Sequence, residues 1–225
     1  MIVLGFDTAT PATAVALLEG HAPGDARERR HDPPAGERPG HASRLLALAH
    51  DLLDEAGLRF ADIDRIAVGL GPGGFTGLRI GVATARALAQ AADAEIVGVS
   101  TLRALAAAAR PAAGQGVLAV VDARRGEVFA AGFRGERQLL GPLAIAPSAL
   151  GALAGAGWLA LGDGALRFRD DLQAAGCVVP ADGSPQHGVS ARMICRLARH
   201  AHRGAERDLL VPDYLRRPDA VPSRP

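Results

Sequence analysis

The chain has 225 residues, a formal net charge of +1, and 48% apolar but only 4% aromatic residues. This composition excludes a disordered chain, and so balanced a charge does not by itself indicate a nucleic-acid or membrane surface. All 25 basic residues are arginine, and the absence of lysine excludes P-loop, Schiff-base and kinase-type phosphate sites, which need that residue.

The two cysteines and the N-terminal segment bear on the cellular compartment. Cys177 falls in a predicted strand and Cys195 in a predicted helix, with no CxxC spacing, so both are expected to be buried free thiols. The N-terminus has no basic segment and reaches Asp7 early, which is typical of a first strand and not of a signal peptide. No apolar run approaches the roughly 20 residues of a membrane span. We therefore expect a cytoplasmic protein without membrane contacts.

The first half of the chain is predicted to begin with a β-hairpin and to continue with helices and strands in alternation. A helical spacing of apolar residues, with Leu45, Leu48 and Leu52 on one face, marks the first helix, and Gly57 ends it. The predicted elements are strands at 2–6, 13–18 and 27–31, a helix at 41–56, a strand at 66–70, a helix capped by Thr76 and running to about 92, a strand at 96–99, and a helix capped by Ser100 and running to about 109.

The second half repeats the opening pattern of the first. The predicted elements are strands at 117–121, 127–133 and near 138–143, a helix from about 188 to 204, and a tail at 211–217. Asp7 and Asp122 each end an apolar strand that is followed by a short turn and a returning strand. This repeat predicts a two-lobed α/β fold in which each lobe is a mixed sheet led by a β-hairpin and covered by helices. The predicted lobes are residues 1–105 and 106–225, and the tail can pack back on the first lobe.

A glycine-rich segment at 69–74 matches the GxGxxG pattern of dinucleotide-binding folds. It lies between a predicted strand and a predicted helix, with Asp93 and Glu95 about 20 residues further on, as that pattern requires. Pro72 removes one backbone donor from the loop, however, and the chain does not begin with a βαβ unit. An NAD-dependent oxidoreductase is therefore an alternative that the sequence disfavours.

The helix that begins at Thr76 is apolar on almost all sides. Gly77, Gly81 and Thr84 give it a face of small residues that lets a neighbouring helix approach closely. Two interpretations remain open: the helix is buried within its own lobe, or it forms a protein interface together with the helix at 41–56.

Five arginines follow a helical spacing near the C-terminus: Arg192, Arg196, Arg199, Arg203 and Arg207. They share one face of the predicted helix. The usual meaning is a solvated face, and the alternative is contact with RNA phosphates, because guanidinium groups match phosphate oxygens.

Candidates for catalysis are few in this sequence. It has no GxSxG, HExxH or CxxC motif and no pair of histidines at i, i+4. Asp7 and Asp122 stand at strand ends, where actin-like ATPases and sugar kinases place acids of their phosphate loops. A self-sufficient ATPase or kinase of that fold is therefore a second alternative.

Four segments are more specific than these patterns: residues 6–10 (FDTAT), 71–81 (GPGGFTGLRIG), 121–128 (VDARRGEV) and 214–216 (YLR). Taken in order, they resemble the bacterial TsaB (YeaZ) family. The resemblance implies the fold of the actin-like ATPase (ASKHA) superfamily. It also implies a partner of the TsaD enzyme in forming N6-threonylcarbamoyladenosine beside the tRNA anticodon, with TsaE in the larger complex and a homodimer when the protein is alone.

The resemblance further implies that the chain has no catalytic site and no cofactor of its own, and that ATP and a metal belong to partner subunits. The paralogous TsaD holds its metal with two histidines, and Thr101 and Leu105 would stand at the matching positions here. The residues expected to bind the partner are His41, Leu45, Leu48, Leu52, Thr76, Gly77, Ile80, Gly81, Thr84 and Leu88. The residues expected to line a vestigial nucleotide cleft are Asp7, Thr8, Thr10, Gly73 and Asp122.

Overall fold

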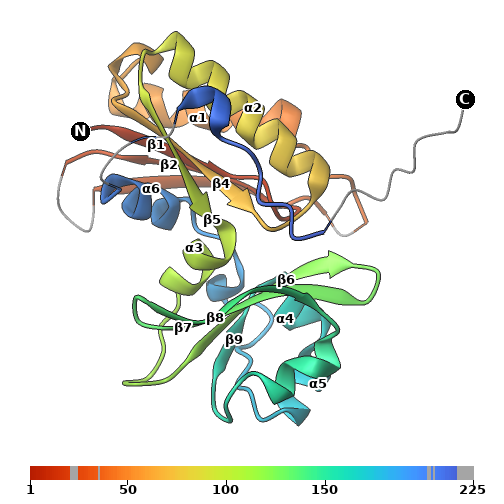
Figure 1. The fold of residues 1–225 in the computed structure, drawn as a ribbon. Helices are drawn as coiled ribbons and strands as arrows, with labels where there is room; N and C mark the ends of the chain where they lie inside the picture. The colour runs from red at the N-terminus through yellow and green to blue at the C-terminus, as the bar shows by residue number, and fades with distance from the viewer. Residues whose placement is uncertain (21–24, 35, 202–203, 205, 217–225) are drawn as a thin grey trace, which may run out of the picture.

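The structure is a computed structural model that describes residues 1–20, 25–34, 36–201, 204 and 206–216. The chain forms two lobes, each with its own mixed β-sheet and helices (Figure 1). The predicted two-lobed α/β architecture is confirmed, including the hairpin that opens each lobe. Within the described part of the chain, no helix is long and apolar enough to cross a membrane.

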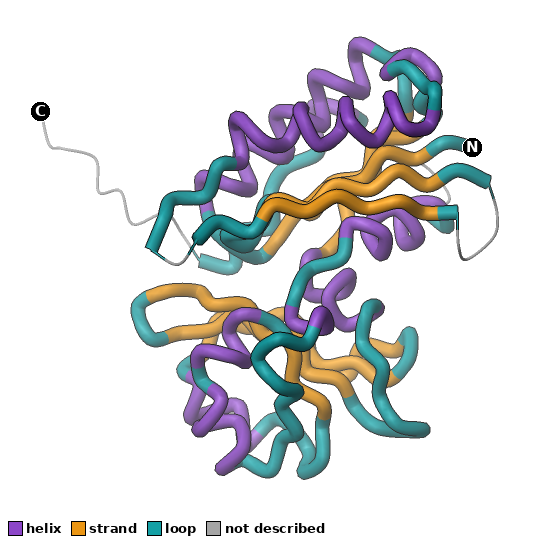
Figure 2. Tube along the Cα trace, turned by 180° about the vertical axis from the view of Figure 1, so that it is seen from behind, coloured by secondary structure: helices purple, strands orange, loops and turns teal. Residues whose placement is uncertain are grey.

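The N-terminal lobe is a five-stranded sheet with helices on both faces. Its strand order is β3-β2-β1-β4-β5, and β1 pairs antiparallel with β2 and parallel with β4. The strands are β1 (Val3–Asp7), β2 (Thr13–Leu18), β3 (Ala26–His31), β4 (Arg65–Gly71) and β5 (Glu95–Ser100). One face carries α1 (His41–Ala56) and α2 (Phe75–Ala91), and α6 (Ala191–Arg199) covers the other, as Figure 2 shows from behind. A short 3-10 turn, η1 (Phe60–Asp62), precedes β4.

Alternation along the strands explains why both faces are covered. Leu4 and Phe6 of β1 belong to the core beneath α1 and α2, whereas Val3 belongs to the core against α6. Successive side chains of a strand point to opposite faces of the sheet, so an apolar strand without polar positions needs a layer on each side. All five residues of β1 and all six of β2 are buried.

The C-terminal lobe repeats this plan with four strands in the order β8-β7-β6-β9. Its elements are β6 (Val117–Arg124), β7 (Glu127–Arg134), β8 (Arg137–Ile145), η2 (Pro147–Ala152), β9 (Leu159–Leu161), α4 (Asp163–Arg167), α5 (Arg169–Ala174) and η3 (Pro185–His187). The helix α3 (Thr101–Ala107) links the lobes, and its Leu102 and Leu105 pack on the sheet face that carries Ala119. Leu118 and Val120 face the other way, toward α4 and α5.

The α6 helix belongs to the N-terminal lobe although it lies near the end of the chain. Cys195 is fully buried against β1 and β2. Arg65, at the start of β4, secures the end of the helix: its Nη1 donates to the carbonyl oxygen of Ala198 at 2.6 Å, and the side chain also pairs with Glu95. Because these carbonyls have no partner inside the helix, a buried guanidinium is an effective cap.

The predicted division of the chain differs from this arrangement. The predicted second lobe, 106–225, includes α6 and the segment 210–216, yet α6 and Leu210 pack into the two cores of the N-terminal lobe. The chain therefore leaves the N-terminal lobe after α3, builds the C-terminal lobe, and returns. A short turn, η4 (Arg207–Leu209), leads into the final segment.

Three predicted boundaries are also corrected. The N-cap of α2 is Gly74, which keeps an extended backbone, so Thr76 lies in the first turn and does not cap the helix. The predicted helix at 188–204 is only nine residues long, because a 3-10 turn and an extended Ser190 precede it. Cys177 lies outside any strand, beside the isolated bridge between Val178 and the three-residue strand β9.

Candidate functional site

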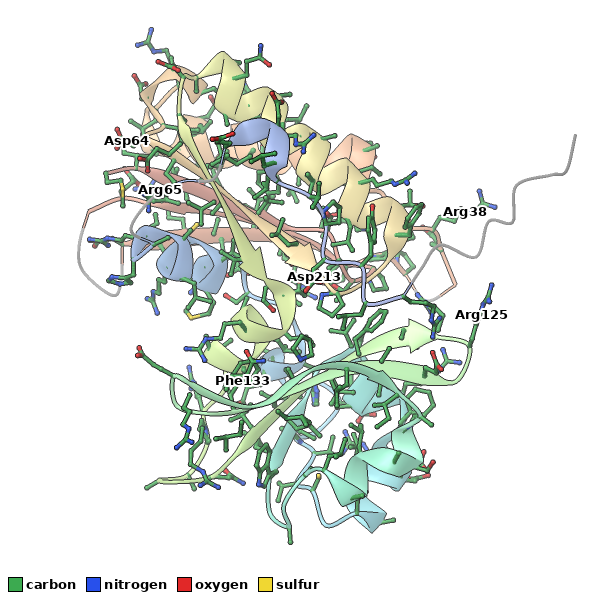
Figure 3. All side chains as sticks on the ribbon, in the orientation of Figure 1. Arg38, Asp64, Arg65, Arg125, Phe133 and Asp213 are labelled. Carbon is green, nitrogen blue, oxygen red and sulfur yellow. The ribbon has the colours of Figure 1, made fainter. Side chains whose placement is uncertain are left out.

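A cavity of about 820 Å³ lies between the two lobes. Four parts of the chain line it: the loops after β1 and β4 in the N-terminal lobe, the segment 38–41 at the start of α1, the β6–β7 turn with Asp163 in the C-terminal lobe, and residues 213–216. Figure 3 draws the side chains of both lobes, including those between the two sheets. The volume is of the size that small-molecule sites usually have.

Asp7 ends β1 just behind this cavity and is 1% exposed. Its Oδ1 accepts a hydrogen bond from the Ala9 N–H at 2.9 Å, and its Oδ2 accepts one from the Thr101 hydroxyl at 2.6 Å. The Thr101 oxygen in turn accepts the Gly71 N–H at 3.1 Å. Burial raises the pKa of the Asp7 carboxyl, and the bonds from Thr101 and Ala9 offset part of that rise. Asp7 thus ties the ends of β1 and β4 to the start of α3 and does not line the cavity.

The acids of the C-terminal lobe are also engaged. Asp122 Oδ2 lies 3.1 Å from Nη1 of Arg167 and 3.4 Å from Nη1 of Arg124, and only 7% of the Asp122 side chain is exposed. Asp163 Oδ1 accepts the backbone N–H of Asp122 at 3.1 Å and that of Gly164 at 2.9 Å. Burial raises the pKa of the Asp163 carboxyl. Both carboxylates therefore serve internal contacts.

Four of the five residues predicted for the nucleotide cleft line the cavity: Thr8, Thr10, Gly73 and Asp122. The fifth, Asp7, is a correction, because its side chain turns away into the protein and is bonded there. A magnesium nucleotide in an actin-like cleft would need open carboxylate oxygens, and the engaged acids do not fit that demand. No cluster of three metal-ligating side chains occurs among the residues that the structure describes.

The segment predicted as a tail that can pack back on the first lobe lies at the mouth of the cavity. We call residues 210–216 the C-terminal strap. On the N-terminal lobe, Leu210 is buried in the core, and the Asp213 N–H donates to the carbonyl oxygen of Leu70, near the end of β4, at 2.8 Å. The Tyr214 ring lies 5.2 Å from the ring of Phe75, at the start of α2.

The strap also reaches the C-terminal lobe. Leu215 packs against the core that faces α3. Arg216 donates to the carbonyl oxygen of Ala123 at 3.2 Å and forms an ion pair with Glu127. One segment therefore contacts both lobes beside the cavity. The motif at 214–216 was the available signal for it, but its partners are distant in sequence.

Half of the residues predicted to bind a partner are buried inside the N-terminal lobe: His41, Leu45, Leu52, Gly77 and Gly81. This corrects their predicted role, because buried residues cannot touch another protein while the lobe keeps this fold. His41 Nδ1 lies 2.8 Å from the Thr13 hydroxyl, and burial lowers the pKa of His41, as expected for a core histidine.

The two glycines are needed for packing. A Cβ on Gly81 would overlap the Thr8 hydroxyl, and one on Gly77 would overlap the Thr8 carbonyl oxygen and approach His41. The Thr8 hydroxyl donates to the Gly77 carbonyl oxygen at 2.8 Å. Close approach of α2 to the end of β1 therefore requires small residues at these two positions. The two glycines are buried within their own lobe, as the first of the two interpretations expected.

The other five predicted residues reach the surface of the α1 and α2 pair: Leu48, Thr76, Ile80, Thr84 and Leu88. Ala83 and Ala87 are exposed between them, and Leu46 of α1 is 49% exposed. The spacing puts Ile80, Ala83 and Ala87 on adjoining rows of α2, so they form one uncharged strip along the helix. We define the α1–α2 surface as the five predicted residues that reach the surface together with Leu46, Ala83 and Ala87.

The arginines predicted to form one face near the C-terminus are only partly solvated. Arg192 is exposed and pairs with Glu28, which also accepts the N–H of Ala191 at 3.2 Å. Arg196 and Arg199 are half-buried beside this contact. Arg203 and the side chain of Arg207, two further members of the predicted face, lie outside the described residues.

Comparison of the sequence with known proteins shows which family the chain resembles. A family model described as TsaD, tRNA N6-adenosine threonylcarbamoyltransferase, matches residues 33–152, more than half of the chain. The Escherichia coli tRNA threonylcarbamoyladenosine biosynthesis protein TsaB is 39% identical over 130 residues, which cover 57% of this chain and 53% of that protein.

Solved structures extend the match to the whole chain. YeaZ from Pseudomonas aeruginosa is 32% identical, covers 95% of this chain and 99% of its own, and superimposes with a TM-score of 0.77. A hexokinase of the ROK family from Thermus thermophilus, 14% identical, gives a TM-score of 0.51 over 88% of this chain and 98% of its own. The second likeness concerns the fold alone and agrees with the predicted actin-like architecture. From the first likeness and the shared segments, we conclude that the chain belongs to the TsaB (YeaZ) family.

Proposed function

We propose that this protein takes part in the biosynthesis of threonylcarbamoyladenosine in tRNA as a non-catalytic subunit that binds a TsaD-type enzyme. The names of its relatives support the pathway. The observation that carries the role is the α1–α2 surface, whose α2 part is an uncharged strip of small and aliphatic side chains and which includes the exposed Leu46 of α1. Strips of this kind allow close helix–helix packing between proteins.

The chemistry of the inter-lobe cavity supports a non-catalytic role. Thr101 stands where a TsaD-type enzyme is expected to hold a metal ligand, and its hydroxyl bonds to Asp7. Leu105, at the second ligand position, is fully buried among apolar side chains. A threonine hydroxyl engaged in this way and a leucine are not ligands for a metal that imidazole would bind. In this proposal, ATP and the metal are supplied by the partner subunits.

The proposal includes a homodimer when the protein is alone. The same surface would serve both complexes, so that TsaD and a second copy compete for it. A standard protein interface removes about 1,600 Å² from water in total, which two helices on each side can supply.

The test is copurification of tagged protein with the TsaD of the same organism. Ala83→Arg and Ala87→Arg place a bulky charge on the exposed centre of the surface without touching the core, so both variants are expected to fold and to lose TsaD. Ala174→Arg, on an exposed position of α5 in the other lobe, is the matched control and should retain TsaD. Retention by all three variants would contradict the assigned surface.

A further inference from the structure

Exposed arginines from both lobes meet at the rim of the inter-lobe cavity. Arg38 approaches it from the segment before α1, and Arg124 and Arg125 approach it from the β6–β7 turn. Figure 3 shows Arg38 and Arg125 at the same end of the molecule, one on each lobe. The chain as a whole carries a net charge of only +1, so this gathering is a local feature.

The carboxylates near the rim lie deeper than these arginines, with one exception. Asp122 is paired with Arg167 and with Arg124 of the rim itself, and Asp163 is half-buried and accepts two backbone N–H groups. Asp213, on the C-terminal strap, is exposed. An anion at the mouth would therefore meet the guanidinium groups of Arg38 and Arg125, that of Arg124, which also lies 3.4 Å from Asp122, and one exposed carboxylate.

The β6–β7 turn holds its arginines in an unusual backbone conformation. Arg124 has φ of 64° and Arg125 has φ of 54°. The left-handed region is unfavourable for a residue with a side chain. The two central residues of this turn are Arg125 and Gly126, and hairpins of this kind usually carry Asn and Gly at these two positions. Strained residues of this kind concentrate at functional sites. The turn presents these two neighbouring arginines at the cavity rim.

An aromatic ring stands beside the same rim. Tyr214 is the only tyrosine of the chain and is 39% exposed. Its ring packs on Phe75, and Arg79 lies over Phe75 at 3.8 Å from the ring centre and donates to the Tyr214 hydroxyl at 3.3 Å. These contacts fix the ring in place and leave part of it open to solvent.

We propose that this rim, Arg38, Arg124, Arg125 and Tyr214, binds a single-stranded segment of RNA, with the guanidinium groups on phosphates and a base stacked on the tyrosine. Arginines along a groove beside an exposed aromatic ring are the combination that single-stranded nucleic acids require. An acidic peptide would use the charges but gain little from the ring. The choice of RNA over DNA as the ligand rests on the proposed function. The inference that the rim binds a single strand rests on the arginines and the tyrosine alone.

Fluorescence anisotropy of a labelled ten-nucleotide oligouridine, titrated with the full-length chain at several salt concentrations, tests this inference. Each phosphate contact in a single strand contributes about −0.7 to the slope of log K against log salt, so three arginines predict a slope near −2. Arg125→Gln should reduce the slope by about 0.7. Tyr214→Ala should weaken binding roughly 5- to 150-fold, while Tyr214→Phe, which keeps the ring, should not. Asp213→Asn should strengthen binding, because it removes the opposing charge.

A matched control separates this rim from general charge effects. Arg137→Gln removes an exposed arginine of β8 and should leave binding unchanged. The inference is overturned if the wild-type chain does not bind at low salt, if the control variant loses binding as much as Arg125→Gln does, or if an acidic peptide binds as tightly as the oligonucleotide. Copurification of the rim variants with TsaD distinguishes failure of the RNA-binding inference from failure of the proposed function. The α1–α2 surface is intact in all rim variants, so they should still copurify with TsaD.

Discussion

Thr101→Val replaces a fully buried hydroxyl by a methyl group of nearly the same shape. The change removes the bond from Thr101 to Asp7 and the bond from Gly71 to Thr101. It leaves a buried N–H without this partner and a buried carboxylate with one donor fewer. Each such group costs about 1–3 kcal/mol, and because the carboxylate keeps its bond from the Ala9 N–H, we expect a loss in the lower part of the combined range, about 2–4 kcal/mol in the free energy of unfolding.

The loss should depend on pH in a defined direction. Burial raises the folded-state pKa of Asp7 above its ordinary value of 3.8, so stability from this group is greatest below that value and is lost as pH rises through the folded-state pKa. Removing the Thr101 donor raises the folded-state pKa further. The destabilisation should therefore be smaller at pH 4.5 than at pH 8.

Urea unfolding followed by circular dichroism measures both effects. With a slope of about 2 kcal/mol per molar urea, the expected loss lowers the unfolding midpoint by roughly 1–2 M. Thr101→Ser keeps the hydroxyl and serves as the control, with a smaller loss that does not change with pH. A loss under about 0.5 kcal/mol, or an equal loss for Thr101→Val at all pH values, would refute the assigned role of this bond.

Three further changes test the packing of the N-terminal lobe. Gly81→Ala should lower stability by about 1–3 kcal/mol because its Cβ meets the end of β1, whereas Gly74→Ala, whose nearest neighbour is 3.5 Å away, should not; thermal unfolding compares them. Arg65→Met should cost roughly 3 kcal/mol, because it leaves buried carbonyls at the end of α6 unpaired, and amide exchange there should quicken; unchanged exchange would contradict the role of α6 as part of this lobe. Cys195 should react with a thiol reagent only after unfolding, because burial raises the pKa of its thiol and closes access, and rapid labelling of the native protein would disprove this.

Much of the fold could be predicted because local patterns and packing agree. The spacing of Leu45, Leu48 and Leu52 located α1 with its observed bounds, and the apolar runs located the strands that open each lobe. The short elements α4 and α5 and the strand β9 were missed, since three to six residues carry too little periodicity to be read.

The predicted site was less accurate, for physical reasons. An apolar or small residue on a helix serves a core and an interface equally well, so the sequence could not separate buried Gly81 from exposed Ala83. Asp7 stood at the expected strand end, but the direction of its side chain depends on Thr101, which is 94 residues away. The course of the C-terminal strap across the cavity likewise depends on contacts between distant segments.

The most direct test of the proposed role is light scattering on the chain after size-exclusion chromatography, alone and mixed with the TsaD of the same organism. The account predicts a homodimer that exchanges into a heterocomplex, with Ala83→Arg monomeric and unable to join it and Ala174→Arg behaving as wild type. A wild-type chain that elutes apart from TsaD, or an Ala83→Arg variant that joins it normally, would contradict the account.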